Sequence, residues 1–238
     1  MVAWGVLLCA APLAMAGHPL SSDDASTADV GTCQVEAWSA RDTRDASARS
    51  VVLAPACSLA AGLELGADHS RFSAGGTQLG QGGLALKWVP AAWRVDSAAG
   101  ALNFGLKLSG TWLKAAGVNW QAAQTGALVL ATLKVNETVV LHANLGPARD
   151  RALRTQGTLL NLAVEWAPLD ALALFAEAQG NDRREVFGRT VLSVGTRWWL
   201  LQNTLGLNLS AGRQAGPGAG TGTGTRWSFG LGWYGIGS

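Results

Sequence analysis

Large apolar residues occupy every second position along much of this chain. In the segment Thr225–Tyr234 they are Trp227, Phe229, Leu231 and Trp233, and the residues between them are small or polar. A period of two is typical of a β-strand with two unlike faces. Because indole rings stand at both ends of the apolar set, the segment resembles a strand that crosses a lipid bilayer. Taken alone, it could equally be a half-buried strand of an ordinary sheet.

Twelve segments of this kind, each bounded by turn-forming residues, are predicted to be strands. They are Thr32–Ser39, Ser50–Ala56, Leu59–Asp68, Leu79–Trp88, Ala101–Trp112, Thr125–Leu133, Thr138–Gly146, Thr158–Trp166, Ala171–Gln179, Arg189–Trp198, Thr204–Gly212 and Thr225–Tyr234. Most of them place apolar residues on one face and polar residues on the other. The sixth is mostly apolar, so its two faces are ambiguous.

The connections between these segments alternate in length. The short ones are Lys134–Glu137, Ala167–Asp170 and Trp199–Asn203. The long ones, richer in charge, Gly or Thr, are Ser70–Gln78, Leu113–Gln124, Pro147–Gly157, Gly180–Gly188 and Arg213–Gly224. Short turns at one end and long loops at the other are typical of an outer-membrane barrel whose long loops lie outside the cell. Val89–Gly100 is an exception, since it falls on the short-turn side and is long.

The composition favours a barrel over other classes of protein. Only 14% of the 238 residues are charged, and the mean hydropathy is +0.18. Beyond the N-terminal stretch, no apolar run approaches the roughly 18–20 residues that a membrane-spanning helix needs. We therefore predict an all-β, transmembrane, antiparallel up-and-down barrel of about 12 strands. The net charge is +2 with acids and bases interspersed, so nucleic acid is not an expected partner.

The first 31 residues are predicted to lie outside the barrel. Met1–Ala16 is apolar and ends in Ala14-Met15-Ala16, which fits a cleaved secretory signal peptide, although no Lys or Arg precedes Arg41. Residues 17–31 are polar and aperiodic, and we interpret them as a periplasmic N-terminal arm in an extended conformation. The barrel then spans residues 32–238, and the protein is expected in the bacterial outer membrane.

Removal of the leader leaves two cysteines, Cys33 and Cys57. They lie near the same rim of two neighbouring predicted strands. A disulfide between them is one expectation for an oxidising compartment, and two buried thiols are the alternative.

Polar and ionisable residues share the inward parity of the predicted strands. Because a charge facing lipid at mid-bilayer costs about 2–4 kcal/mol, these residues are expected to line the lumen. The candidates are Glu36, Glu64, Lys87, Asn103, Lys107, His142, Asn144, Asn161, Glu165, Glu177, Arg197, Asn208 and Arg226. Two roles stay open: a network of ion pairs that fills the lumen, or ladders of acids and bases along a narrow water path that sorts solutes by charge.

Six tryptophans share the parity of the lipid-facing residues and fall near strand ends. They are Trp88, Trp112, Trp166, Trp198, Trp227 and Trp233. We expect them to form aromatic girdles at the two membrane interfaces.

Catalytic and metal chemistry find less support. His142 with Ser193 or Ser210 could form part of a Ser–His–Asn hydrolase set, but nothing in the sequence brings these side chains together. His18 and His69 are isolated and have no spaced Cys or Asp partner. We predict no metal site and no cofactor.

Three short motifs resemble a known family. His18-Pro19-Leu20-Ser21-Ser22-Asp23-Asp24 is similar to the His-Pro-Leu-x-Thr-Asp-Asp opening of the outer-membrane proteins called "MetA-pathway of phenol degradation". The segments Leu141–Gly146 and Trp166–Glu177 resemble strand–turn–strand segments of that family. The chain departs from it at Ser21-Ser22 and in a shorter Arg41–Arg49 loop. The resemblance implies a β-barrel that passes small molecules, aromatic ones among them.

We therefore expect an outer-membrane channel or uptake protein for small solutes, including aromatic or hydrophobic ones, and not an enzyme. The expected partners are outer-membrane lipid, a small-molecule solute, and the outer-membrane assembly machinery, which would engage the C-terminal strand. A closed structural or surface-interaction barrel is the second hypothesis, and an outer-membrane hydrolase is the third.

Overall fold

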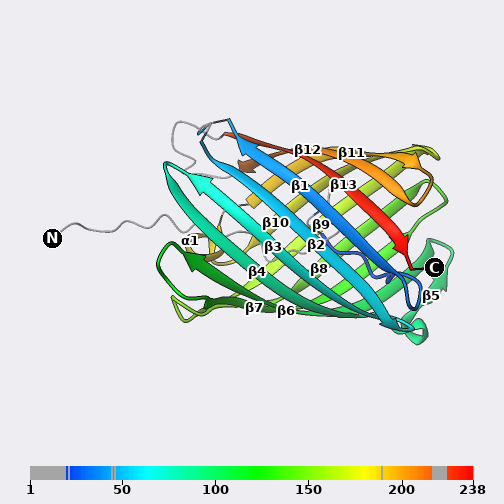
Figure 1. The fold of residues 1–238 in the computed structure, drawn as a ribbon. Helices are drawn as coiled ribbons and strands as arrows, with labels where there is room; N and C mark the ends of the chain where they lie inside the picture. The colour runs from blue at the N-terminus through cyan, green and yellow to red at the C-terminus, as the bar shows by residue number, and fades with distance from the viewer. Residues whose placement is uncertain are drawn as a thin grey trace.

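The chain forms a closed antiparallel β-barrel in a computed structural model that describes residues 20, 22–43, 45, 47–188, 190–215 and 224–237 (Figure 1). Within these residues, twelve long strands build the wall and confirm the predicted fold. They are β1 Cys33–Asp42, β2 Arg49–Ala60, β3 Leu63–Ala74, β4 Thr77–Trp88, β6 Gly100–Ala115, β7 Gln121–Lys134, β8 Val139–Asp150, β9 Thr155–Leu169, β10 Leu172–Asn181, β11 Thr190–Leu201, β12 Leu205–Ala215 and β13 Thr225–Ile236. Consecutive wall strands pair with each other, and the pairing of β1 with β13 closes the wall.

The connection between β4 and β6 is the long exception that the sequence indicated. It holds the 3-10 helix η1, Ala91–Trp93, and the short strand β5, Val95–Ser97, which pairs with β6. Trp93 packs on Trp88 at the end of β4, with ring centroids 4.9 Å apart. Because β4 and β6 pair directly past this excursion, it does not interrupt the wall. Neither η1 nor α1, Arg184–Phe187, nor any other described helix has the length and apolar character of a membrane span.

The strands extend further than the alternation predicted, so several long connections are corrected to shorter ones. The predicted loop Ser70–Gln78 is a turn at Gly75 and Gly76, between the end of β3 and the start of β4. Both glycines have a positive φ, which a two-residue hairpin turn of this kind requires. The ladder continues through residues 70–74, where large apolar residues no longer occupy every second position, because strand hydrogen bonds do not depend on an apolar face. Hydrophobic alternation therefore does not predict these extensions of the strands.

The two faces of each strand differ in their exposure as the alternation predicts. On β6, Leu106 and Leu108 are 37% and 56% exposed, whereas Lys107 between them is 2% exposed. The six tryptophans named above lie on the outer surface near strand ends and are 37% to 59% exposed. Their role as lipid-interface girdles stays a prediction.

Strand β7, whose faces the sequence left ambiguous, is apolar on both sides because its inner face contacts other residues of the chain. Leu128 and Leu130 are buried in one cluster with Ala25, and Val89 and Leu159 pack against it. A small apolar core therefore lies inside the barrel, between the wall and the N-terminal residues.

The two ends of the barrel give a test of orientation. Residues 135–138 join β7 to β8 at the end where β13 finishes, and residues 116–120 join β6 to β7 at the opposite end. We predict that Val118→Cys reacts with a membrane-impermeant maleimide on intact cells, whereas Glu137→Cys reacts only after the outer membrane is opened. Cys33 and Cys57 are bonded to each other, which limits background labelling. Labelling of Glu137→Cys alone on intact cells would reverse the orientation.

Candidate functional site

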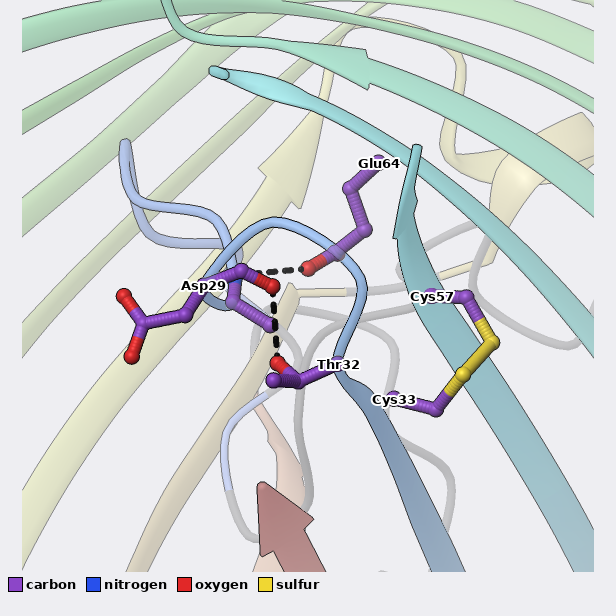
Figure 2. Close-up of a disulfide and its surroundings, with 6 residues drawn as sticks. Asp29, Thr32, Cys33, Cys57 and Glu64 are labelled. Atoms are coloured by element: carbon purple, nitrogen blue, oxygen red, sulfur yellow. Dashed lines mark hydrogen bonds between the residues drawn. A yellow bond between two sulfur atoms is a disulfide. The ribbon is translucent and has the colours of Figure 1, made fainter. Parts of the chain in front are cut away.

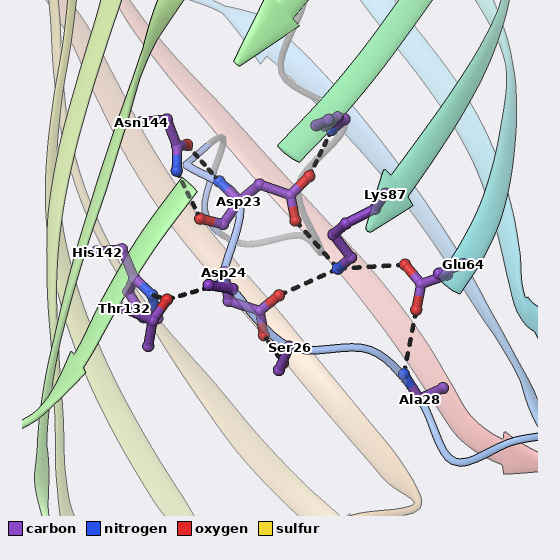
Figure 3. A network of polar contacts seen from close by, with 11 residues as sticks. Asp23, Asp24, Ser26, Ala28, Glu64, Lys87, Thr132, His142 and Asn144 are labelled. Atoms are coloured by element: carbon purple, nitrogen blue, oxygen red, sulfur yellow. Dashed lines mark hydrogen bonds and ion pairs between the residues drawn. The ribbon is translucent and has the colours of Figure 1, made fainter. Parts of the chain in front are cut away.

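Residues 22–28 lie inside the barrel and residues 29–31 connect them to its rim; we call residues 22–31 the lumen segment (Figure 3). The sequence predicted an extended periplasmic arm here, and the structure corrects this prediction for the residues that it describes. Ser22, Asp23 and Ala25 are buried, with 3%, 6% and 1% exposure. An aperiodic polar segment has the same composition whether water or a polar lumen surrounds it. The hydrophobic pattern therefore could not distinguish the two cases.

Asp23 is held on three sides by the wall. Its carboxylate accepts from Lys87 Nζ at 3.3 Å through Oδ1 and from Lys107 Nζ through Oδ2. Its backbone N–H donates to Asn144 Oδ1 at 2.7 Å, and its carbonyl oxygen accepts from Asn144 Nδ2 at 2.8 Å. Figure 3 shows Asp23 between Asn144 on one side and Lys87 on the other. The sequence predicted these wall residues for the lumen but missed their shared partner.

Three carboxylates contact the ammonium group of Lys87. Besides Asp23, it contacts Asp24 Oδ1 at 3.1 Å and Glu64 Oε1 at 3.2 Å. Lys107 stands directly opposite Lys87 in the β4–β6 ladder. Two like charges that face each other across strands destabilise a sheet unless anions compensate them. The lumen segment supplies part of that compensation.

Further side chains of the wall hold the rest of the lumen segment. Both the backbone N–H and the hydroxyl of Ser22 donate to Glu177. The N–H of Ala25 donates to Thr132 Oγ1 at 2.8 Å, and the N–H of Ala28 donates to Glu64 Oε2 at 3.2 Å. These contacts come from strands on opposite sides of the barrel, so the segment crosses the lumen.

A second polar cluster lies on the other side of the lumen. Arg197 Nη2 lies 3.6 Å from Glu36 Oε1, and Arg197 Nε donates to Asn208 Oδ1 at 3.0 Å. The guanidinium carbon lies 5.3 Å from the ring centroid of Trp199 and 5.2 Å from that of Tyr234. The hydroxyl of Tyr234 donates to Glu36. The sequence missed Tyr234, although it shares the parity of Arg226 on the same strand.

The remaining predicted lumen residues are spread along the barrel. Asn161 is 5% exposed, Asn103 is half-buried, and Glu165 lines an internal cavity. Arg226 lies near the opposite end of β13 from Tyr234, where its Nη2 donates to Ser50 Oγ at 2.8 Å. Within the wall, Lys87 pairs with Glu64 and Arg197 pairs with Glu36. Lys87 and Lys107 also form ion pairs with Asp23 of the lumen segment.

The root of the lumen segment is fixed at the rim of the barrel. Cys33 and Cys57 are direct partners in the β1–β2 ladder and form a disulfide (Figure 2). Next to it, the N–H of Gly31 donates to the carbonyl of Ser58 at 3.1 Å, and Ser58 N–H donates to the carbonyl of Thr32 at 3.0 Å. The disulfide and these two hydrogen bonds therefore fix the chain to the wall at the point where it passes from β1 into the lumen.

A cavity of about 150 Å³ remains beside the lumen segment. It is lined by both lysines, Asp23, Asp24, the Glu36–Arg197–Tyr234 cluster and Phe175. Towards the other end of the barrel, Phe187 of α1 packs against Ala148 and Leu159. Gly157 leaves the space for this ring, since a Cβ there would lie 2.7 Å from Phe187. The lumen is thus narrowed by two separate pieces of chain.

The described contacts do not assemble the hydrolase set or a metal site. Thr132 Oγ1 lies 3.0 Å from His142 Nδ1, Ser193 Oγ donates to Glu177 at 3.2 Å, and Ser210 hydrogen-bonds Ser228. Among the residues that the structure describes, no group of three His, Cys, Asp or Glu side chains could hold a metal ion.

The closed barrel, with an apolar outer face and a polar lumen, defines the class of protein, an outer-membrane β-barrel. More particularly, the chain belongs to the family described as "Uncharacterised conserved protein UCP029691", whose model matches residues 5–229. No curated protein matches the chain.

Solved structures of two porins share this fold. The KdgM porin matches with a TM-score of 0.58 at 10% identity, and the NanC porin with 0.62 at 6%, each over 84% of this chain and 98% of that one. An active-site mutant of outer membrane phospholipase A from Escherichia coli matches with a TM-score of 0.51 at 10% identity, over 87% of this chain and 91% of that one. The fold places the protein in the bacterial outer membrane. The phenol-degradation family remains a resemblance.

Loss of one lysine tests how tightly the lumen segment is coupled to the wall. Lys107→Met removes an ammonium group that contacts a buried carboxylate, so we expect the free energy of unfolding to fall by about 3 kcal/mol. Lys114→Met, the same change at an exposed position of the same strand, should cost less than about 1 kcal/mol. Urea unfolding in detergent micelles measures both. Equal losses for the two variants would mean that Lys107 is simply solvated.

Proposed function

We propose that this protein is an outer-membrane channel for small solutes and that the lumen segment closes it in the conformation described here. The observation that carries the proposal is how the segment is attached. Among the described residues, side-chain hydrogen bonds join Ser22, Asp23, Asp24, Ala25 and Ala28 to the wall, and no backbone–backbone hydrogen bond joins residues 22–30 to a strand. At the root of the segment, Gly31 has a backbone hydrogen bond to Ser58, which can stay in place. The segment can therefore leave the lumen without unpairing the barrel.

The chemistry of the lumen favours polar solutes over aromatic or hydrophobic ones. The inner wall carries buried Lys87, Lys107, Glu64 and Glu177, which would be poor neighbours for an apolar molecule. The fold likeness to the KdgM porin, which has also been solved in complex with disordered oligogalacturonate, is compatible with a polar solute. The resemblance to the phenol-degradation family supports transport in general, and the aromatic preference that it implies finds little support in this lumen.

A closed structural barrel is the second candidate, because the lumen segment and α1 together narrow the lumen. In that case the loops would carry the function. Under either candidate, we propose that Met1–Ala16 is a cleaved signal peptide and that the C-terminal strand is read by the outer-membrane assembly machinery.

Conductance separates the two candidates. We predict that the wild-type protein in a planar bilayer conducts rarely, and that Asp23→Asn combined with Asp24→Asn raises the open probability several-fold. The two changes keep the side-chain shape but remove the negative charges that hold Lys87 and Lys107.

Asp29→Asn is the matched control, because Asp29 lies in the same segment but is exposed at the rim. It should leave the current unchanged. A sealed record for all three proteins would overturn the channel and favour the closed structural barrel.

A further inference from the structure

The wall of this barrel contains a pair of buried lysines that requires anions. Lys87 and Lys107 are direct partners on the neighbouring strands β4 and β6, and their side chains are 9% and 2% exposed. Two ammonium groups in this position repel each other, and a buried charge is tolerated only when it is paired. The pairing of these two strands therefore creates an anion site within the lumen.

The lumen segment occupies this site with carboxylates. Asp23 contacts both lysines, and Asp24 contacts Lys87. An ammonium group has three N–H donors, and Lys87 has carboxylate contacts from Asp23, Asp24 and Glu64. Two of these three partners leave if the segment leaves, and Lys107 loses Asp23 at the same time. The two lysines would then be available to other carboxylates.

A small molecule has room to reach the same ammonium groups. The cavity of about 150 Å³ is lined by Lys87 and Lys107 together with Asp23 and Asp24, so it opens directly beside the occupied site. We propose that Lys87 and Lys107 form a binding site for small carboxylate-bearing solutes, and that Asp23 and Asp24 occupy it as an internal competitor. The inference rests on the proposed channel function and names the class of solute.

Neighbouring acids keep the affinity of this site low. Glu64 lies 3.2 Å from Lys87, and Asp68 lies on the same face of β3 as Glu64. Both stay on the wall when the lumen segment moves. Their negative charge repels a bound carboxylate solute and weakens its binding. Weak binding allows the solute to leave the site again, as passage through a channel requires.

Binding of a dicarboxylate in detergent tests the site without any need for current. Isothermal titration of the Asp23→Asn, Asp24→Asn protein with succinate should give saturable binding, and titration with the neutral succinamide should give none. The wild-type protein should bind succinate at least about tenfold more weakly, because its own carboxylates compete for the lysines. Heat-dependent gel mobility confirms that each variant is a folded barrel.

A further substitution locates the binding on the lysine pair. In the same background, Lys107→Met should weaken succinate binding about tenfold, whereas Lys114→Met should not change it. Equal binding of succinate and succinamide, or an equal loss in both lysine variants, would overturn the proposed site. If succinate binds but no current is recorded, the channel function is wrong and the binding site stands. If current is recorded but succinate does not bind, the binding site is wrong and the channel function stands.

Discussion

The interior of this barrel depends on one electrostatic contact, the carboxylate of Asp23 between Lys87 and Lys107. The β4–β6 pairing fixes the two lysines opposite each other, so their repulsion is built into the wall. A carboxylate between them converts that repulsion into two ion pairs. Asn144 then fixes the backbone of Asp23, and Ala25 covers Leu128 and Leu130. Order in the lumen segment follows from these contacts.

The other fixed point of the segment is its root. Gly31 has a φ of 81°, a conformation that suits glycine, and it lets the chain turn from the rim into the lumen. The disulfide between Cys33 and Cys57 ties the next residues to the wall. The segment is therefore fixed at its root, whereas its other residues are held in the lumen mainly by side-chain contacts. These residues could swing out of the lumen about the root. Release costs ion pairs and a small apolar contact, while the ladder of the barrel stays intact.

The sequence predicted the wall well and the interior poorly, for physical reasons. Alternation identified all twelve wall strands, because lipid on one side and a polar lumen on the other impose a period of two. It placed Lys87, Lys107 and Asn144 on the inner face, but strand register is needed to see that the lysines are opposite. Asp23 lies in an aperiodic segment, where no pattern reports a partner about 60 to 120 residues away. The apolar inner face of β7 was a sign in the sequence that another part of the chain packs inside the barrel.

Cross-linking between the lumen segment and β7 tests the account most directly. With Ala25→Cys and Leu130→Cys in one chain, a short bifunctional maleimide should join the two residues in detergent, detected by mass spectrometry after proteolysis. Ala25 and Leu130 are packed in one buried cluster, whereas Val129, next along the strand, is 51% exposed on the outer face. Ala25→Cys paired with Val129→Cys should therefore give no cross-link. Equal cross-linking of both pairs, or none at Leu130, would contradict a segment folded into the lumen.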